Sequence, residues 1–327
     1  MKVLVAIYSP IAAWCIPEVE VERLRRAFPE HTFLRADSDA ETVERIPDAD
    51  VAFGARFRPE QLAAARRLRW IHSPAAGVGN MLFPEMVASP VAITNSRGNS
   101  SATIADHVIA VTLALLRDLR LAWRRQAERT WAQDEFEAGA SIRTLRDARV
   151  LVIGLGSIGG ETARLAAALG AHVVGIRRRA GAQPPAGLAA VVTPDRLHDE
   201  LPLADVVVLA APQTAATVRL IGDRELAMMR DGAVLVNVSR GKLVDEAALV
   251  RALDTGRLRG AALDVFEHEP LAPDSPLWAR PDVLVTPHVS GFHRHFWRDA
   301  VTMFADNLHR FAAGLPLANP VDKQAGY

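Results

Sequence analysis

Three residues in the second half of the chain have types and positions suited to acid–base chemistry. Arg240 lies in the run Asn237–Gly241, and Glu269 and His288 follow it, each just after an apolar, strand-like run. They supply a fixed cation, a carboxylate and a group that titrates near neutral pH. Consecutive strand ends of a parallel α/β sheet point to one edge, where ligands bind, so the three can meet. This set suits the reduction of a 2-keto acid: arginine holds the carbonyl and carboxylate, histidine protonates the developing alkoxide, and glutamate keeps that histidine charged.

A glycine-rich turn upstream predicts a dinucleotide site. The strand-like run Arg149–Ile153 leads into Gly-Leu-Gly-Ser-Ile-Gly, and an alanine- and leucine-rich helical stretch and a second strand, Ala171–Ile176, follow. Such glycines permit a tight turn, backbone approach to a pyrophosphate and close packing of helix on strand. The phosphates would lie at the helix N-terminus, where unpaired N–H groups favour negative charge. The residues predicted to bind the cofactor here are Gly154, Gly156, Ser157, Ile158 and Gly159.

The end of the second strand predicts which cofactor is preferred. Sites for NAD usually carry an acidic residue there, which accepts hydrogen bonds from the ribose 2′-hydroxyl. This chain instead continues with Arg177, Arg178 and Arg179. A 2′-phosphate would meet no negative charge and could form charge-assisted hydrogen bonds with Arg177 or Arg178. We therefore expect NADP(H) to be preferred, with NAD(H) possible.

Composition limits the classes of partner. Basic and acidic residues are balanced, 38 of each, which argues against nucleic acid or a charged membrane surface. The start Met1–Ile7 fits a first strand better than a signal peptide, and no apolar run approaches membrane-spanning length. The single cysteine, Cys15, fits a reducing cytoplasm. Neither His293 nor His295 has an acidic or cysteine cluster at ligand spacing beside it, so no metal site is expected.

Strand and helix signals alternate along the whole chain, which indicates parallel sheets covered by helices. The first third contains five candidate strands: Lys2–Ile7, His31–Leu34, Val51–Phe53, Trp70–Ser73 and Val91–Thr94. Helices are predicted at Glu18–Ala27, Pro59–Leu68, Pro84–Val87, Ser101–Arg129 and Phe292–Gly314. Six further strands match a Rossmann-type sheet: Val150–Ile153, His172–Ile176, Val206–Ala210, Ala233–Val238, Ala261–Asp264 and Val283–Thr286. The stretch Ser101–Arg129, without glycine or proline, suits one long helix bridging two domains, and Gln183–Gly187 suits a surface loop.

Together these motifs resemble the D-isomer-specific 2-hydroxyacid dehydrogenases, most closely their glyoxylate/hydroxypyruvate reductase branch. The resemblance extends over nearly the whole chain and is weakest in residues 1–70 and after Gly291. The motifs that carry it, in addition to the glycine turn, are Ala75–Gly79, Thr94–Gly98, Asn237–Gly241, Ala262–Phe266, Glu269-Pro270 and Thr286–His288 with Gly291.

The resemblance implies roles for individual residues. Arg240, Glu269 and His288 would be catalytic, and Asp264 would contact the nicotinamide carboxamide. Pro212 and Val238 are also assigned to the cofactor site, and Ala76, Gly77 and Val78, together with Arg240, to the substrate. The fold would be α/β with two doubly wound parallel-sheet domains. A Rossmann-type cofactor domain, residues 99–291, would be inserted in a flavodoxin-like substrate domain, residues 1–98 and 292–327. The family also implies a homodimer through the cofactor domain.

Two alternatives stay open beside hydride transfer between NADP(H) and a small 2-keto or 2-hydroxy acid. One is a formate- or phosphite-type dehydrogenase of the same fold. The other is a nucleotide-sensing binding protein like the C-terminal-binding protein corepressors. We favour an enzyme, because the chain has neither a disordered tail nor a basic patch. Which keto acid is the physiological substrate is left open.

Overall fold

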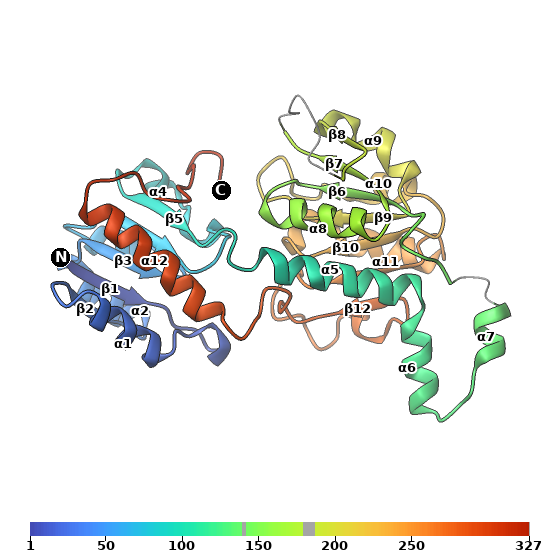
Figure 1. Cartoon of the computed structure of the whole chain (residues 1–327), viewed down its shortest axis with the longest axis horizontal. Helices are drawn as coiled ribbons and strands as arrows, with labels where there is room; N and C mark the ends of the chain where they lie inside the picture. The colour runs from blue at the N-terminus through green and yellow to red at the C-terminus, as the bar shows by residue number, and fades with distance from the viewer. Residues whose placement is uncertain (139–141, 179–186, 327) are drawn as a thin grey trace. The chain divides into compact units, whose positions relative to one another are not determined.

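The computed structural model describes residues 1–138, 142–178 and 187–326, which form two compact units. Unit 1 comprises Met1–Asn99 and His293–Tyr327, and unit 2 comprises Ser100–Phe292 (Figure 1). Each unit is built on a parallel sheet covered by helices on both faces. The α/β class and the two doubly wound parallel sheets expected from the alternating signals are therefore confirmed.

The sheet of unit 1 has the strand order β2-β1-β3-β4-β5, which is the flavodoxin-like order 2-1-3-4-5. All five predicted strands are present, with bounds that differ by at most one residue at each end. They are β1 (Lys2–Ala6), β2 (Thr32–Arg35), β3 (Val51–Gly54), β4 (Trp70–Ser73) and β5 (Ala92–Asn95). The helices are α1 (Glu18–Ala27), α2 (Asp39–Arg45), α3 (Pro59–Ala64), α4 (Pro84–Ala88) and α12 (Phe296–Ala312), with short 3₁₀ helices at Ala12–Trp14, Ile46–Asp48 and Gly79–Met81.

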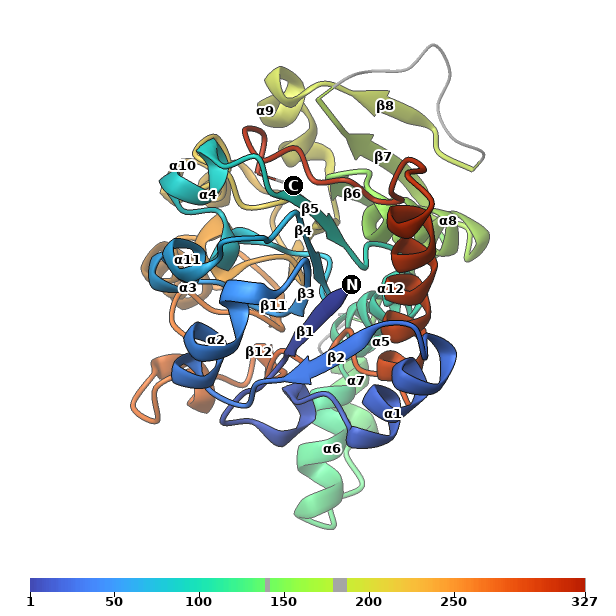
Figure 2. The same cartoon turned by 90° about the vertical axis from the view of Figure 1, so that its left-hand side faces the viewer.

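Alternation along β1 explains how the two faces of this sheet are covered. Val3 and Val5 pack with α1 and α12, whereas Leu4 and Ala6 pack with the side of α2, α3 and α4. Figure 2 shows the two helix layers on opposite sides of the sheet. The predicted tail helix thus packs on the first part of the chain, as expected. Helix α2 was missed, although Ser38 caps it by accepting a hydrogen bond from the Glu41 N–H at 3.1 Å.

The sheet of unit 2 has the order β12-β11-β10-β9-β6-β7-β8, which is Rossmann-like with one more strand at the edge beyond β11. The strands are β6 (Arg149–Ile153), β7 (His172–Ile176), β8 (Ala190–Val192), β9 (Val206–Leu209), β10 (Val234–Asn237), β11 (Gly260–Leu263) and β12 (Val283–Val285). The helices are α5 (Ser101–Leu116), α6 (Leu119–Ala127), α7 (Gln133–Ala138), α8 (Ser157–Ala168), α9 (Leu197–Glu200), α10 (Asp223–Met228) and α11 (Glu246–Asp254). Short 3₁₀ helices lie at Pro194–Arg196, Leu201–Leu203, Gly241–Leu243 and Pro276–Ala279.

Two expectations about this unit were wrong. The sheet has seven strands and not six, because the three residues of β8 are too few to give an alternating pattern. The stretch Ser101–Arg129 is not one helix bridging two domains: Asp118 adopts the left-handed conformation with φ of 53° and separates α5 from α6. Both helices belong to unit 2, where α5 and α8 cover one face of the sheet and α9, α10 and α11 the other.

No helix in the described ranges is both long and apolar enough to cross a membrane.

Candidate functional site

The carboxyl edge of the unit 2 sheet carries the candidate catalytic residues. Arg240 follows β10, Glu269 follows β11 and His288 follows β12, and these three strands are adjacent and parallel. Their registers pair Asn237 with Leu263 and Leu263 with Val285, so the three strands end at one level. The topology therefore places three residues that are far apart in sequence on neighbouring loops.

His288 and Glu269 form a hydrogen-bonded pair. The imidazole Nδ1 lies 2.7 Å from Glu269 Oε2, and both side chains are partly exposed. The other carboxylate oxygen, Oε1, accepts a hydrogen bond from the Phe266 N–H at 3.0 Å, which fixes the carboxylate on its loop. The carboxylate thus holds Nδ1 and orients the imidazole ring on its loop. This is the geometry of an oriented acid–base histidine.

The charges of this site act on Glu269 in opposite directions. Burial disfavours the carboxylate, but the hydrogen bond and charge of His288, the Phe266 N–H and the charge of Arg240 outweigh it, so the pKa of Glu269 lies below its ordinary value. The glutamate is therefore ionised at neutral pH.

Arg240 is anchored at the end of β10 by its own loop. The Asn237 side chain spans this loop: its amide donates to the Arg240 carbonyl at 3.0 Å and its oxygen accepts from the Ser239 N–H at 3.1 Å. Burial lowers the pKa of Arg240 and the charge of Glu269 opposes that shift, but a guanidinium stays charged at neutral pH. A Cβ on Gly241 would lie 1.8 Å from the Phe266 carbonyl carbon, so only glycine lets the β10 and β11 loops approach this closely.

Asp264 organises the loop that bears His288. Its carboxylate, 1% exposed, accepts hydrogen bonds from the Thr286 hydroxyl at 2.6 Å and from the Val289 and Ser290 N–H groups at 2.9 and 3.0 Å. The His288 N–H donates to the Asp264 carbonyl at 2.9 Å, and His288 has a φ of 53°, which is uncommon for a residue other than glycine. The buried Asp264 carboxylate thus holds the residues before and after His288, the candidate proton donor. Its predicted contact with a nicotinamide carboxamide stays a prediction.

Sequence reasoning missed one member of this cluster, His107 on α5. Its Nε2 lies 3.4 Å from Thr286 Oγ1, and burial lowers the pKa of His107 while the charge of Asp264 opposes the shift. The available signal was a histidine spaced by four residues from the buried Val111 on the same helix. That spacing alone cannot distinguish a core histidine from one beside a functional loop.

The glycine turn has the geometry expected for a phosphate cradle. Gly156 is the N-cap of α8, Ser157 and Ile158 open the helix, and a Cβ at Gly156 would meet nothing within 4 Å. A Cβ on Gly159 would lie 1.8 Å from the carbonyl oxygen of Gly154, so the helix packs on the turn without a side chain between them. The open space at the N-terminus of α8 therefore suits a pyrophosphate.

The arginines after β7 lie beside the end of β8. The Arg177 N–H donates to the Val192 carbonyl at 3.1 Å, and Arg177 Nε is buried with no hydrogen-bond partner among the described residues. Arg178 is exposed. Arg179 and most of the predicted loop Gln183–Gly187 lie outside the described residues. A buried donor without an acceptor fits a site that takes an anionic group.

Three further predicted contacts have been located. Val238 is buried directly after β10, and the Pro212 carbonyl, after β9, accepts a hydrogen bond from Thr217 Oγ1 at 2.7 Å. The segment Ala76–Val78 follows β4 in unit 1. Its Ala76 carbonyl accepts a hydrogen bond from the Asn95 amide at 2.7 Å, and Val78 is buried. Across residues 1–138, 142–178 and 187–326, no three or more histidine, cysteine or acidic side chains are grouped as metal ligands would be.

Residues 109–290 match the family model described as the D-isomer specific 2-hydroxyacid dehydrogenase, NAD binding domain. The chain is 31% identical over 326 residues to a D-3-phosphoglycerate dehydrogenase of Archaeoglobus fulgidus, covering 98% of this chain but only 59% of that protein. It is 32% identical over 292 residues to a glyoxylate reductase of Korarchaeum cryptofilum, covering 86% of this chain and 85% of that one.

Solved structures agree with this assignment. A D-isomer specific 2-hydroxyacid dehydrogenase from Xanthobacter autotrophicus, in complex with NADPH and MES, superposes with a TM-score of 0.85 at 32% identity, covering 100% of this chain and 99% of that one. An NADPH-dependent glyoxylate/hydroxypyruvate reductase from Sinorhizobium meliloti gives 0.85 at 28% identity with the same coverage. The chain belongs to the D-isomer specific 2-hydroxyacid dehydrogenase family. It is an oxidoreductase of this class with an NAD(P)-binding domain.

Proposed function

We propose that this chain reduces a small 2-keto acid, glyoxylate or hydroxypyruvate, to the D-2-hydroxy acid with NADPH. The observation that carries the proposal is the 2.7 Å pair of His288 Nδ1 and Glu269 Oε2, which joins the loops after β12 and β11 beside that of Arg240 after β10. The named activities of the relatives from Korarchaeum cryptofilum and Sinorhizobium meliloti support the substrate class. The family name supports the D stereochemistry.

Each of the three residues has a distinct role in this proposal. Arg240 presents a planar fork of donors that matches the carboxylate and keto oxygens of one substrate. His288 donates a proton from Nε2 to the oxygen of the keto group as negative charge develops there, and Glu269 stabilises the imidazolium before the transfer. The bound cofactor supplies the hydride. The segment Ala76–Val78 of unit 1 offers backbone N–H groups for the substrate carboxylate.

The open space at Gly156 and the arginines after β7 fit the phosphates of NADP(H). Gly154 to Gly159 would hold the pyrophosphate at the N-terminus of α8, while Arg177 and Arg178 would bind the 2′-phosphate. Pro212, Val238 and Asp264 follow neighbouring strands at the same edge, and we assign them to the rest of the cofactor. The single free cysteine, Cys15, supports a reducing compartment.

The cofactor preference gives the first expected result. The kcat/KM for NADPH should exceed that for NADH by at least about tenfold with the same keto acid, since one or two charge-assisted hydrogen bonds contribute roughly 1.5–3 kcal/mol each. Initial rates at 340 nm with glyoxylate, hydroxypyruvate and pyruvate would measure it. Arg177→Ala should bring the NADPH/NADH ratio of kcat/KM closer to unity. Arg196→Ala, at an exposed arginine after β8, serves as a matched control. A ratio at or below unity for the wild type would refute the preference.

Replacement of Glu269 tests its electrostatic role. In Glu269→Gln the proposed proton donor loses the carboxylate to which it is hydrogen-bonded and which would favour its charged form. The basic limb of the pH profile for keto-acid reduction should therefore move to lower pH. Glu225→Gln is the matched control, because it removes the partner of His198 (2.9 Å) elsewhere in unit 2. If the basic limb stays in place or moves to higher pH, Glu269 does not assist proton donation by His288.

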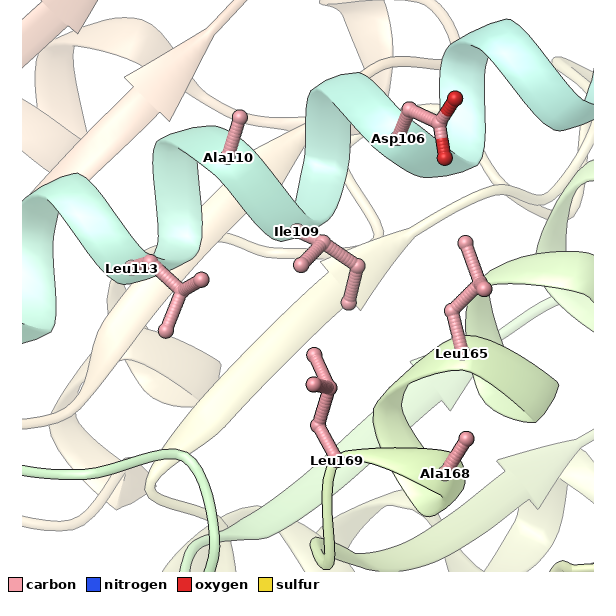
Figure 3. A pocket seen from close by; sticks show the side chains of 7 residues that line it. All are labelled: Asp106, Ile109, Ala110, Leu113, Leu165, Ala168 and Leu169. Carbon is pink, nitrogen blue, oxygen red and sulfur yellow. The ribbon is translucent and has the colours of Figure 1, made fainter.

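We also propose a homodimer formed through unit 2. Helices α6 and α7 extend away from the sheet of this unit (Figure 1). Trp123 lies on α6, and Trp131, which is 89% exposed, lies between the two helices. A hollow of about 390 Å³ between α5 and α8 is lined almost wholly by apolar side chains (Figure 3). Its lining consists of Asp106, Ile109, Ala110, Leu113, Leu165, Ala168 and Leu169. Exposed apolar surface of this kind is typical of a protein interface.

Leu169→Glu tests this interface. Leu169 is 45% exposed, so a charge there should be tolerated by the isolated fold but not by an apolar contact between two copies. Light scattering after size exclusion should give twice the chain mass for the wild type and a smaller apparent mass for Leu169→Glu at micromolar concentration. The exposed Leu203→Glu is the control. A wild-type mass of one chain would rule out the dimer.

A further inference from the structure

A buried histidine in unit 1 takes part in a continuous hydrogen-bonded chain that the proposed chemistry does not use. His72, on β4, is 0% exposed and packs against the rings of Phe53 and Phe304. Its Nδ1 lies 2.7 Å from Thr94 Oγ1 and its Nε2 lies 3.1 Å from Ser96 Oγ. Burial with no charged partner lowers the pKa of His72 to about 3, so the ring is neutral at physiological pH.

The direction of every hydrogen bond in this chain can be assigned. The Ser96 hydroxyl donates its only proton to the Ser73 carbonyl at 3.0 Å, so towards His72 it can only accept. The proton of the neutral ring is therefore on Nε2, and Nδ1 accepts from the Thr94 hydroxyl. Thr94 in turn accepts from the Trp70 indole N–H at 2.8 Å. One tautomer of His72 satisfies all of these groups.

This series of hydrogen bonds ends on the backbone that leads into the segment Ala76–Val78. In addition to the hydroxyl of Ser96, its backbone N–H donates hydrogen bonds to the Ser73 carbonyl at 3.0 Å and to the Ala75 carbonyl at 3.3 Å. The Ala75 N–H donates to Ser73 Oγ at 3.2 Å, and the amide of Asn95, beside Ser96, holds the Ala76 carbonyl. Hydrogen bonds from the end of β5 thus hold the loop after β4 in its conformation.

We propose that His72 is a positioning residue: the proton on its Nε2 holds Ser96 against Ser73 and thereby fixes the conformation of Ser73–Val78. The inference rests on the proposed function in so far as this segment binds the substrate carboxylate. An apolar residue would fill the same volume without any hydrogen-bond requirement. The imidazole instead fixes two hydroxyl groups at once, Thr94 on one side and Ser96 on the other, and a loop whose N–H groups bind an anion needs that fixed orientation.

Two amide variants of His72 test its hydrogen bonds to Thr94 and to Ser96 separately. In His72→Gln the amide nitrogen can take the place of Nε2 and donate to Ser96, whereas in His72→Asn the amide oxygen takes the place of Nδ1 and accepts from Thr94. Both variants remove the ring, so their losses of packing are similar. Ser96→Ala leaves the histidine in place and removes the hydroxyl that accepts from His72 and donates to the Ser73 carbonyl, so it tests the same link if a His72 variant does not fold.

Two readouts are measured on the full chain. Hydrogen exchange of a peptide covering residues 74–80, without ligands, should be faster in His72→Asn and Ser96→Ala than in the wild type and His72→Gln. The KM for glyoxylate should rise by about tenfold in the same two variants, a change that corresponds to one lost hydrogen bond of about 1.4 kcal/mol. NADPH affinity should be unchanged, because the glycine turn belongs to unit 2.

The outcomes distinguish this inference from the proposed function. Faster exchange with an unchanged KM would support the role of His72 and remove the segment from the substrate site. Equal exchange in His72→Asn and His72→Gln would overturn the role of His72, whatever happens to KM. Unchanged exchange in Ser96→Ala would overturn it as well.

Discussion

Replacing His288 by glutamine is expected to lower kcat for keto-acid reduction by 10²–10⁴-fold, the usual contribution of a general acid. The glutamine amide can still donate a hydrogen bond, but it cannot transfer a proton to the oxygen of the keto group. NADPH binding should stay nearly intact, because His288 lies on the loop after β12, whereas the cofactor phosphates are expected at the glycine turn after β6. Steady-state rates and a titration of NADPH fluorescence would measure the two effects separately.

The chain contains a matched control for this variant. His198, on α9, forms a similar pair with Glu225, with 2.9 Å between Nε2 and Oε1. His198→Gln removes a histidine–carboxylate pair of the same kind that joins helices α9 and α10, and it should leave kcat close to the wild-type value. If His288→Gln retained near-normal kcat with its best keto acid, the proton donor would have to be another group.

The second large effect is a loss of stability in mild acid that depends on His72. An unfolded chain protonates this ring below about pH 6.5, whereas burial delays protonation in the folded chain to a pKa of about 3. Between these values the unfolded state binds more protons, so the free energy of unfolding falls as pH falls. At about 1.4 kcal/mol per pH unit, the step from pH 7 to pH 4.5 should remove about 3 kcal/mol.

Comparison with His72→Gln isolates this contribution from those of the other titrating groups. The variant is less stable than the wild type at pH 7, because it loses the packing of the ring in the aromatic core. This difference should shrink by about 3 kcal/mol at pH 4.5, where the buried imidazole costs the wild type stability. Hydrogen exchange of the β4 strand, Trp70–Ser73, reports on unit 1 alone. A difference that is independent of pH would contradict protonation of the unfolded chain at His72.

Much of the candidate site could be predicted because its elements are local in sequence. The glycine turn lies between one strand and one helix, and Arg240, Glu269 and His288 each follow a recognisable apolar run. Once the strands are known to be parallel, these residues must share the carboxyl edge of the sheet. Residue type, spacing and the period of the strands were sufficient for this step. The same signals predicted eleven of the described strands to within one residue at each end.

Only the tertiary structure decided which groups those loops pack against. Asp264 accepts hydrogen bonds from a loop more than twenty residues away, and His107 reaches that loop from a helix near the start of unit 2. The break at Asp118 and the short strand β8 likewise depend on backbone geometry and on a neighbouring strand, neither of which leaves a periodic pattern in the chain.

His72 shows the same division most clearly. From sequence it is a histidine within an apolar strand, a pattern that predicts burial but not a partner. The proton on Nε2 follows only from Ser96, whose hydroxyl is committed to the Ser73 carbonyl. The sequence therefore determined the chemistry that each residue can supply and the sheet edge at which the candidate catalytic residues lie. The tertiary structure decided the orientation of each donor and acceptor, because hydrogen bonds between distant segments depend on distances that no local pattern encodes.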